Sequence, residues 1–490
     1  MENENISAKG EPVFRGKKTK IVATIGPASD KRETLKQMVE SGMNVARLNF
    51  SHGDYPSHLK IIENVRGLSE EMGKNIGIMA DLQGPRIRIS VENELEVEKG
   101  EEIVISDISF KGSEWDAGKE TKTIFLDYPG IIQDIEVGNV ILIEDGLKSV
   151  KVTKKENNHL LAEVIDGGVI KNEKGVNIPD AKLNVPPITE RDERDLEFSL
   201  RNEVDYVALS FVSSGEDIED LRNRIKEILG RENNLPKIVA KIERKEAIEN
   251  LDGIIAKTDA VMVARGDLGI EINETRVAIL QKEIISKSMK GLKPVIVATE
   301  MLNSMIENPR PTRAEVSDVT NAVIDHADAV MLSGESANGK YPVESVKTMA
   351  EIIENTEESP YDDMSDFEID HEFSDEYTNF IKSVRSFLFG SEAKSIAILS
   401  RGGFTARVIS HFRPNQIILA GTNNEKTYNQ LSLVWGIEAF FLKDGKIEEV
   451  IENMIKKAQE EKIIESGNKI VLIGKNDERN SRFVDVREIN

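Results

Sequence analysis

The sequence of 490 residues contains no cysteine. This absence excludes a disulfide framework, a thiol nucleophile and any metal site built from cysteine ligands. The sequence also lacks an uninterrupted apolar run of about 18 residues, the length that a membrane-spanning helix needs. Its N-terminal segment is polar and has no apolar signal-peptide core. We therefore expect a cytoplasmic protein that has no membrane partner.

The sequence also contains fewer basic residues than acidic ones. The chain has 64 Lys and Arg residues against 87 Asp and Glu residues, and its net charge is −23. This charge disfavours binding to nucleic acids and to anionic membranes, so we expect neither as a partner. Phosphorylated substrates would then require basic side chains that are gathered locally at the binding site.

The composition is otherwise that of a globular protein, with 39% hydrophobic and 31% charged residues. The length suggests about three domains. Changes in the sequence pattern indicate where they lie. We predict a tail at residues 1–16, a main domain formed by 17–84 and 188–355, an inserted domain at 85–187 and a last domain at 356–490.

The main domain contains eight short apolar runs, each followed by a helical pattern, with the insertion placed after the third run. The runs lie at residues 19–25, 43–50, 76–81, 206–211, 237–243, 260–264, 294–298 and 329–332. Continuous apolar runs indicate strands that are buried on both faces. Eight such units predict a closed (β/α)8 barrel, with an open doubly wound sheet as the alternative. We expect Ser29 or Asp30 to cap the first helix, and Thr189 to cap the helix at 190–202.

The inserted domain and the last domain show different patterns. Residues 85–187 alternate between apolar and polar positions, are punctuated by glycine and lack helical periodicity, which predicts a small β-rich domain. Residues 356–490 begin with an acidic irregular segment and then return to alternating helices and strands, which predicts a small α/β domain. Its helices are expected at 377–388, 405–410 and 447–459, and its strands at 395–399, 416–420, 470–473 and 483–486.

Two consecutive strands of the predicted barrel end in charged residues. The fifth run ends in Lys241-Ile242-Glu243, and the sixth, reached through one short helix, is followed by Arg265-Gly266-Asp267. The C-terminal ends of parallel strands face one rim, where the active sites of such barrels lie. A lysine and two carboxylates at this rim could hold a divalent cation and the phosphate bound to it. In the alternative interpretation, these charges only cap the strands and pair with one another.

The barrel prediction places further polar side chains at the same rim. These are Arg47, Asn49, Ser51, Asp81, Ser210, Thr299 and Glu335. Arg47 and Lys241 would supply positive charge to a phosphoryl group during transfer, where catalysis is mostly positioning and electrostatics. Gly266 permits a close approach of the backbone to a ligand. The alternatives are a structural ion pair for Arg47, a helix cap for Thr299 and a surface turn for His52.

Seven segments occur in the order in which one known family carries them. They read KTKIVATIGPAS, MNVARLNFSHG, KGVNIP, KIVAKIE, MVARGDLGIEI, MLNSMIENPRPTRAEVSDV and MLSGESANGKYPVESV. Over nearly its full length the chain resembles the pyruvate kinase family, and its insertion lies where that family carries a lid domain. The resemblance implies phosphoryl transfer from phosphoenolpyruvate to ADP, giving pyruvate and ATP in the last step of glycolysis. It also implies a homotetramer, since family members are usually homotetramers.

The resemblance assigns roles to residues that match the motifs of the family. Lys241 resembles the lysine that stabilises the transferring phosphoryl group, Arg47 the arginine that contacts it, and Thr299 the threonine associated with protonation of the enolate. Glu243 and Asp267 resemble the ligands of Mg²⁺ or Mn²⁺. The implied substrate contacts are Arg47, Lys241, Ser210, Gly266, Asp267 and Thr299, and the implied nucleotide contacts are Arg88, Lys174, His52 and Asn49.

The match to the potassium site of the family is incomplete. Three of its four ligands are matched, by Asn49, Ser51 and Asp81. The fourth ligand is a threonine in potassium-dependent members and is Leu82 here, which leaves only a backbone carbonyl to bind the ion. Gln83 and Arg86 replace a lysine and a glutamate of those members, and the guanidinium of Arg86 carries a permanent charge. Leu82, Gln83 and Arg86 together resemble the potassium-independent branch, so we expect that K⁺ is not required.

The segment Ser400-Arg401-Gly402-Gly403-Phe404-Thr405 lies between a predicted strand and a predicted helix. Free backbone N–H groups at a helix start form a phosphate cradle. A tight strand-to-helix turn is the alternative. In the family this loop helps to bind sugar-phosphate or nucleotide effectors, and here glycines replace its serine- or threonine-rich version. We expect a phosphorylated effector, of unspecified identity, to contact Ser400, Arg401, Gly402, Gly403 and Thr405.

Two other functions are compatible with a charged barrel rim. One is a barrel lyase or aldolase that acts on an enolpyruvate with a Glu/Asp–magnesium pair. The inserted lid and Lys174 argue against it, because an aldolase needs no nucleotide clamp. The other is a non-catalytic sensor of phosphorylated metabolites. The retention of Lys241, Glu243 and Asp267 argues against a sensor, which need not keep the residues of phosphoryl transfer.

Overall fold

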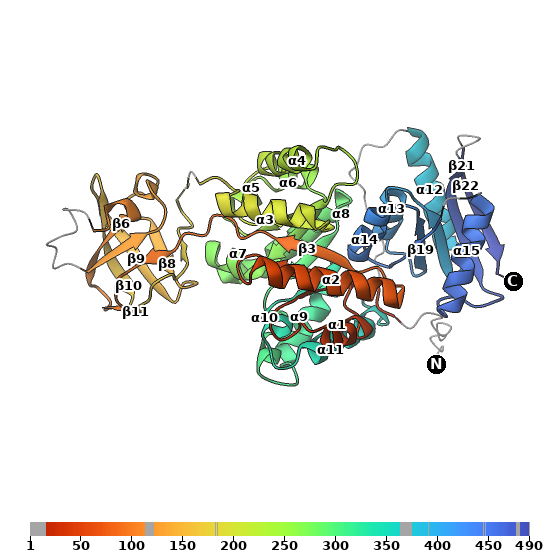
Figure 1. The fold of residues 1–490 in the computed structure, drawn as a ribbon, viewed down its shortest axis with the longest axis horizontal. Helices are drawn as coiled ribbons and strands as arrows, with labels where there is room; N and C mark the ends of the chain where they lie inside the picture. Colours follow the sequence, from red (N-terminus) through yellow and green to blue (C-terminus); the bar gives the residue numbers. More distant parts are fainter. Residues whose placement is uncertain are drawn as a thin grey trace, which may run out of the picture.

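The computed structural model describes residues 16–112, 122–181, 183, 185–362, 375–390, 392–443, 445, 447–476 and 481–489. A barrel occupies the centre of the molecule, with a small β-sheet domain at one end and an α/β domain at the other (Figure 1). Apart from Gly16, the predicted N-terminal tail lies outside the described residues. None of the helices in the described ranges is long and apolar enough to cross a membrane.

The central barrel is a closed sheet of eight parallel strands. They are β1 (Lys20–Thr24), β2 (Val45–Asn49), β3 (Gly77–Asp81), β13 (Tyr206–Leu209), β14 (Lys237–Ile242), β15 (Ala260–Ala264), β16 (Val295–Ala298) and β17 (Ala329–Leu332). Their order is β1-β17-β16-β15-β14-β13-β3-β2, and the barrel closes where Lys20 pairs with Ala329. The predicted (β/α)8 barrel is confirmed, and the open doubly wound sheet is wrong.

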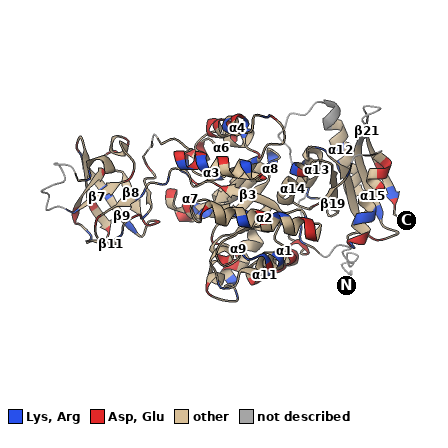
Figure 2. Ribbon diagram, viewed as in Figure 1, with Lys and Arg blue, Asp and Glu red and all other residues tan. Residues whose placement is uncertain are grey.

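Helices surround the strands on the outside of the barrel. They are α1 (Arg32–Glu40), α2 (Tyr55–Met72), α3 (Glu190–Arg201), α4 (Gly215–Leu229), α5 (Lys245–Glu249), α6 (Leu251–Lys257), α7 (Arg265–Glu271), α8 (Val277–Lys290), α9 (Arg313–Ile324), α10 (Gly334–Ala337) and α11 (Pro342–Glu357). Figure 2 shows acidic and basic residues on these outer helices. The polar outer faces leave the apolar faces free to pack on the sheet, which builds the main core.

Two local expectations for the barrel helices need correction. The single helix expected between the fifth and sixth strands is two short helices, α5 and α6, that meet at Asn250. The N-cap of α1 is Lys31, without a side-chain cap, so neither Ser29 nor Asp30 caps this helix. The Ser29 hydroxyl instead accepts the Gly26 N–H over 3.2 Å and holds the turn after β1. The cap by Thr189 is confirmed, because its side chain and that of Asp192 form a capping box.

The chain between β3 and α3 forms the inserted β domain. Its strands are β4 (Ile89–Ser90), β5 (Leu95–Val97), β6 (Glu102–Asp107), β7 (Thr123–Leu126), β8 (Val140–Ile143), β9 (Lys148–Lys155), β10 (His159–Asp166), β11 (Gly168–Ile170) and β12 (Val176–Asn177). Seven of them form one sheet, in the order β12-β8-β9-β10-β6-β7-β4, and β5 pairs with β11. Because the domain has its own hydrophobic core, it forms a separate unit over the barrel rim.

The last domain is a five-stranded sheet with helices. Its strands are β18 (Ser395–Leu399), β19 (Ile417–Thr422), β20 (Ile437–Phe441), β21 (Lys469–Asn476) and β22 (Ser481–Glu488), and its helices are α12 (Asp375–Gly390), α13 (Phe404–His411), α14 (Glu425–Gln430) and α15 (Ile447–Glu460). The order is β20-β19-β18-β21-β22, with β22 antiparallel to its neighbour. The α/β prediction is confirmed, although it omitted β20 and α14. The exact domain boundaries stay a prediction.

The last domain packs against the end of the barrel that lies opposite the predicted active-site rim. The 3-10 turn η5 (Leu431–Leu433) places Leu433 in the hydrophobic cluster that fills the barrel interior. The Tyr206 hydroxyl, at the start of β13, donates to the Gln430 carbonyl. The N-terminal ends of the strands are therefore covered, and the C-terminal ends face the inserted domain.

Candidate active site

Lys241 lies at the C-terminal end of β14, where oxygen atoms from three residues surround its ammonium group. Its Nζ lies 2.8 Å from Glu243 Oε1 and 3.2 Å from Asp81 Oδ1. It also donates to Ser210 Oγ over 2.7 Å. These residues come from or directly follow three adjacent strands, β3, β13 and β14, so closure of the barrel brings them together. The predicted convergence at the rim is confirmed for this group.

Arg47 reaches the same cluster from β2. Its Nε donates to Asp81 Oδ2 over 2.6 Å, and its Nη1 donates to Thr24 Oγ1 over 2.8 Å. The exposed fraction is 8% for Arg47 and 1% for Asp81. Asp81 therefore bridges two cations, one on each of its oxygens. The ion pair of Arg47 is structural, and it also orients the guanidinium at the rim.

The opposing charges determine the protonation states of this cluster. Burial alone would lower the pKa of Lys241, but the carboxylates of Asp81 and Glu243 outweigh burial and hold that pKa above its usual value. Burial likewise opposes ionisation of Asp81, yet Arg47 and Lys241 hold its pKa below the usual range. At neutral pH the rim thus carries a stable ammonium group against a stable carboxylate.

Glu243 and Asp267 form a pair of carboxylates that suits a divalent cation. Glu243 is buried, and its Oε2 accepts the Phe211 N–H over 2.7 Å. Burial raises the pKa of Glu243, Lys241 opposes the rise, and the charge of Asp267 adds to it. A divalent cation would relieve this repulsion. The described residues contain no cluster of three metal-ligating side chains, but Mg²⁺ typically takes one or two carboxylates and completes its shell with substrate and water.

Thr299 follows β16 and is bound to the start of α7. The Gly266 N–H donates to Thr299 Oγ1 over 2.8 Å, and Oγ1 in turn donates to the Ala298 carbonyl over 2.6 Å. The backbone of Thr299 is left-handed, with φ of 69°, which is uncommon for a β-branched residue. Arg265 stabilises this conformation, because its Nη2 donates to the Thr299 carbonyl over 2.7 Å while Nη1 contacts Asp318 at 2.7 Å.

Comparisons with known proteins identify the family of this chain. The family description "Pyruvate kinase, barrel domain" matches residues 16–346, and "Pyruvate kinase, alpha/beta domain" matches residues 380–489. A pyruvate kinase of Bacillus licheniformis is 41% identical over 462 residues, which cover 93% of this chain and 77% of that protein. The chain belongs to the pyruvate kinase family. A pyruvate kinase of Geobacillus stearothermophilus is 43% identical over 86% of this chain and 71% of its own length.

A solved structure supports membership at the level of the fold. The crystal structure of a pyruvate kinase from Cryptosporidium parvum superposes with a TM-score of 0.87 at 33% identity, over 97% of this chain and 96% of that one. Pyruvate kinases are transferases that use a divalent metal. Family membership therefore confirms the expected enzyme class and favours the kinase over the lyase and the sensor.

Two of the oxygens that the sequence predicts at a monovalent-cation site accept hydrogen bonds within the protein. Asn49 Oδ1 accepts the Ser51 N–H over 3.1 Å, and the Leu82 carbonyl accepts from Ser210 Oγ over 2.8 Å. The Leu82 side chain is buried in the main core. Arg86 is exposed, and its Nη2 lies 3.1 Å from Asp145 Oδ1 of the inserted domain. In this conformation Arg86 thus pairs with Asp145 within the inserted domain, while the cations that contact Asp81 are Arg47 and Lys241.

The residues predicted to bind nucleotide are divided between the lid and the barrel. In the lid, Arg88 Nη1 donates to the Glu173 carbonyl over 3.3 Å, and Lys174 Nζ lies 2.6 Å from Glu144 Oε1. In the barrel, His52 is exposed, and its carbonyl contacts His58 Nε2 at 3.1 Å. The structure therefore does not bring the lid cations into the Lys241 cluster, and each has a protein partner in this conformation.

Glu335 lies just beyond β17, at the rim where the sequence predicts it, but its carboxylate is used within the protein. It is 1% exposed, and both carboxylate oxygens accept backbone N–H groups, from Leu302 over 3.0 Å and from Ser333 over 2.7 Å. Its role is to hold two loops of the barrel. Arg265 is the converse case, since the sequence analysis assigned no role to its side chain. Its only signal was its place directly after β15, beside Gly266.

The predicted effector loop is a turn with partly accessible backbone. Gly403 is the N-cap of α13 and has a φ of 72°, a left-handed conformation that suits glycine. Arg401 and Gly402 are exposed, whereas Gly403 is buried. The Arg401 carbonyl accepts from Thr422 Oγ1 over 3.2 Å, which anchors the loop to β19. Both predicted features, the tight turn and the helix start, are present.

Proposed function

We propose that this member of the pyruvate kinase family transfers the phosphoryl group of phosphoenolpyruvate to ADP, giving pyruvate and ATP as the last step of glycolysis in the cytoplasm. The observation that carries the proposal is the Lys241 ammonium, 12% exposed, which lies among Asp81, Ser210 and Glu243 at the barrel rim. This preorganised positive charge stabilises a phosphoryl group in transfer without a reorganisation cost at the moment of reaction.

The surrounding residues bind different parts of the substrates and the divalent cation. Arg47 and Lys241 bind the transferring phosphoryl group, and the backbone around Gly266 approaches the substrate carboxylate. Glu243 and Asp267 hold the divalent cation, which neutralises phosphate and carboxylate charge when bound. Arg88 and Lys174 bind the nucleotide phosphates once the lid closes over the rim and excludes water.

The enolate that remains after transfer needs a proton at carbon. The Thr299 hydroxyl is held near Gly266 by two hydrogen bonds, on the same rim as Lys241. We assign to Thr299 the delivery of this proton through a water molecule. A water relay suits a hydroxyl whose own proton is already donated to the Ala298 carbonyl.

The decisive experiment is a coupled assay of pyruvate formation from phosphoenolpyruvate and ADP with Mg²⁺. It is run in buffer free of sodium and potassium, and then with potassium added. Turnover under both conditions is the expected result, with the permanent charge of Arg86 replacing K⁺. Turnover only with potassium would retain the kinase and assign the ion to Asn49, Ser51, Asp81 and the Leu82 carbonyl. Folded protein that is inactive in both buffers would refute the kinase.

Two further properties follow from the family. The enzyme is a homotetramer in this proposal, which sedimentation velocity tests directly. The loop Ser400–Thr405 binds a phosphorylated effector through backbone N–H groups. Its support is the exposed Gly402 and the left-handed Gly403 at the start of α13. A shift in the phosphoenolpyruvate concentration dependence on addition of sugar phosphates or nucleoside monophosphates tests this site.

A further inference from the structure

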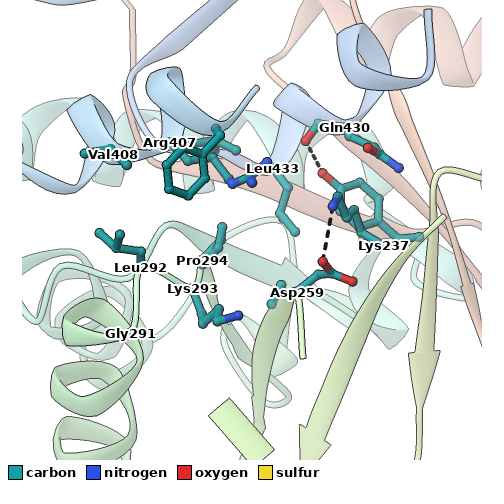
Figure 3. Close-up of a pocket in the computed structure, with 14 residues that line it drawn as sticks. Lys237, Asp259, Gly291, Leu292, Lys293, Pro294, Arg407, Val408, Gln430 and Leu433 are labelled. Atoms are coloured by element: carbon teal, nitrogen blue, oxygen red, sulfur yellow. Dashed lines mark hydrogen bonds and ion pairs between the residues drawn. The ribbon is translucent and has the colours of Figure 1, made fainter. Parts of the chain in front are cut away.

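A cavity of about 90 Å³ lies between the last domain and the barrel end opposite the active-site rim (Figure 3). The barrel contributes the starts of β14 and β15 and the segment before β16, and the last domain contributes α13, α14 and η5. Its charged lining residues are Lys237, Asp259, Lys293 and Arg407. Apolar side chains, among them Phe404 and Leu433, complete the wall.

Arg407 is the most unusual residue of this lining. It lies on α13, and among the described residues its guanidinium forms no hydrogen bond or ion pair. Its contact there is the Phe404 ring, 5.9 Å from the guanidinium carbon. Burial lowers the pKa of Arg407 from its usual value, with Asp259 opposing that effect. The Arg407 side chain is only partly exposed, and a partly desolvated guanidinium without a bonded anion favours an anionic occupant.

The other charges of the lining do not neutralise Arg407. Asp259 is shared between two cations, because it lies 3.2 Å from Lys237 Nζ and 2.9 Å from Arg222 Nη2. Lys293 Nζ donates to the neutral Thr258 carbonyl over 2.7 Å. Burial lowers the pKa of Lys293, Asp259 opposes this, and Arg407 adds to it. The cavity therefore carries excess positive charge in a chain whose net charge is −23.

We propose that this cavity binds a phosphate-class oxyanion, which Arg407 and Lys293 hold from opposite sides. The guanidinium offers paired N–H donors that match two oxygens of such an ion, and the ammonium offers a further donor. The volume of about 90 Å³ favours a single small ion, since sites for drug-sized ligands span about 300–1,000 Å³.

The site lies beside the effector loop, with which it shares Phe404, and it differs from the loop in chemistry. The loop presents backbone N–H groups at its exposed face, whereas the cavity uses two side chains from different domains. An ion held by Arg407 and Lys293 joins α13 to the segment that precedes β16, and β16 leads to Thr299 at its other end. The bound ion thus stabilises the contact between the last domain and the strand that precedes Thr299.

Isothermal titration of the full chain with inorganic phosphate, at constant ionic strength set with chloride, tests the proposal. Arg407→Gln and Lys293→Gln should each weaken one class of phosphate sites about tenfold or more, because each removes a charge-assisted hydrogen bond. Lys290→Gln is the matched control, because this exposed lysine at the end of α8 lies three positions before Lys293 and does not line the cavity. It should keep the affinity of that class of phosphate sites within about twofold of the parent. Phosphate bound near Lys241 is unaffected by all three changes.

The outcomes separate the cavity from other anion sites. Unchanged binding in both Arg407→Gln and Lys293→Gln would overturn the proposal, and so would an equal loss in Lys290→Gln. Glycerol phosphate, titrated in the same way, distinguishes free phosphate from a phosphorylated metabolite as the occupant. If the parent binds glycerol phosphate and Arg407→Gln does not, the cavity accepts the phosphoryl group of a metabolite. If Arg407→Gln fails to fold, Arg407→Lys retains the charge without the paired donors and should still weaken binding. Turnover without phosphate should equal that of the parent.

Discussion

The Gly266 N–H donates to the Thr299 hydroxyl over 2.8 Å, which joins the start of α7 to the residue that follows β16. The two residues are 33 positions apart, and each lies directly beyond an adjacent barrel strand. The bond fixes the hydroxyl at the rim while the backbone of Thr299 stays left-handed. A strained backbone that several hydrogen bonds hold in place is typical of functional sites.

Thr299→Ala removes the hydroxyl that we assign to proton delivery. The expected result is a fall in kcat of about 10²- to 10⁴-fold, the range typical of a lost general acid or base, with a small change in the KM for phosphoenolpyruvate. Thr299→Ser keeps the hydroxyl and should retain most activity. Steady-state kinetics and exchange of the pyruvate methyl protons measure both effects. Turnover of Thr299→Ala within about threefold of the parent would contradict the role.

Arg265→Lys tests whether Arg265 is a positioning residue for Thr299. Arg265 reaches Asp318 and the Thr299 carbonyl through two separate nitrogens. The single nitrogen of lysine does not reproduce this fork, so Thr299 should lose support. We expect kcat to fall about 10- to 100-fold, as for a misplaced catalytic group, with the KM nearly unchanged. Asp318→Asn keeps the bond to Thr299 and is the control, with a smaller loss. Equal losses in both variants would indicate a structural role only.

Lys241→Met removes the central cation of the rim. We expect kcat to fall at least about 10²- to 10³-fold, since one preorganised donor contributes that much. Stability should also fall by about 3–5 kcal/mol, because Asp81 and Glu243 lose a buried partner. Lys237→Met, at the other end of β14, is the matched control and should keep turnover near the parent value. A Lys241→Met variant with more than about a tenth of parent turnover would refute the assignment.

Because His411 is buried, we predict that the protein loses stability in acid. Burial lowers its pKa from 6.5 to about 4, with Asp328 opposing and Arg413 adding to the effect. As the pH falls below 6.5, the unfolded chain binds a proton that the folded chain does not bind until about pH 4. Protonation therefore favours the unfolded chain, and the free energy of unfolding decreases over this range. Between about pH 7 and 5 the parent should lose about 2 kcal/mol more than His411→Leu.

Urea unfolding at both pH values measures the acid effect. His52→Leu, which changes an exposed histidine, serves as the control and should lose as much as the parent. If His411→Leu loses as much unfolding free energy between the two pH values as the parent does, other titratable groups cause the acid sensitivity. The comparison uses the change with pH, so a general destabilisation by the substitution cancels.

The barrel strands were predictable because their sequence signals are local. β15 and β17 were predicted at their observed bounds, since each is an apolar run that begins after an aspartate, Asp259 or Asp328. β20 was missed because it is an edge strand with weak patterning. Its Phe441 is 45% exposed, and Gly436 directly precedes it. Edge strands need not be apolar on both faces, so periodicity does not distinguish them from loops.

The rim cluster was predictable only in part. Lys241 and Glu243 are two positions apart and so share one face of an extended segment, which the sequence shows directly. The bridging of Arg47 and Lys241 by Asp81 depends on strand order and register, which no local pattern contains. The same reason explains why the sequence predicts no role for the side chains of Glu335 and Arg265. Both act on backbone groups more than 30 residues away along the chain.

Closure of the barrel between β1 and β17 has a consequence for synthesis on the ribosome. The two strands are about 300 residues apart in sequence. At about 5–20 residues per second, this separation corresponds to a delay on the order of 15 to 60 s. During that time β1 presents an unpaired edge, and the inserted domain, which has its own core, can complete its folding first. The emerging chain is therefore most exposed to strand-mediated aggregation before Leu332 leaves the exit tunnel.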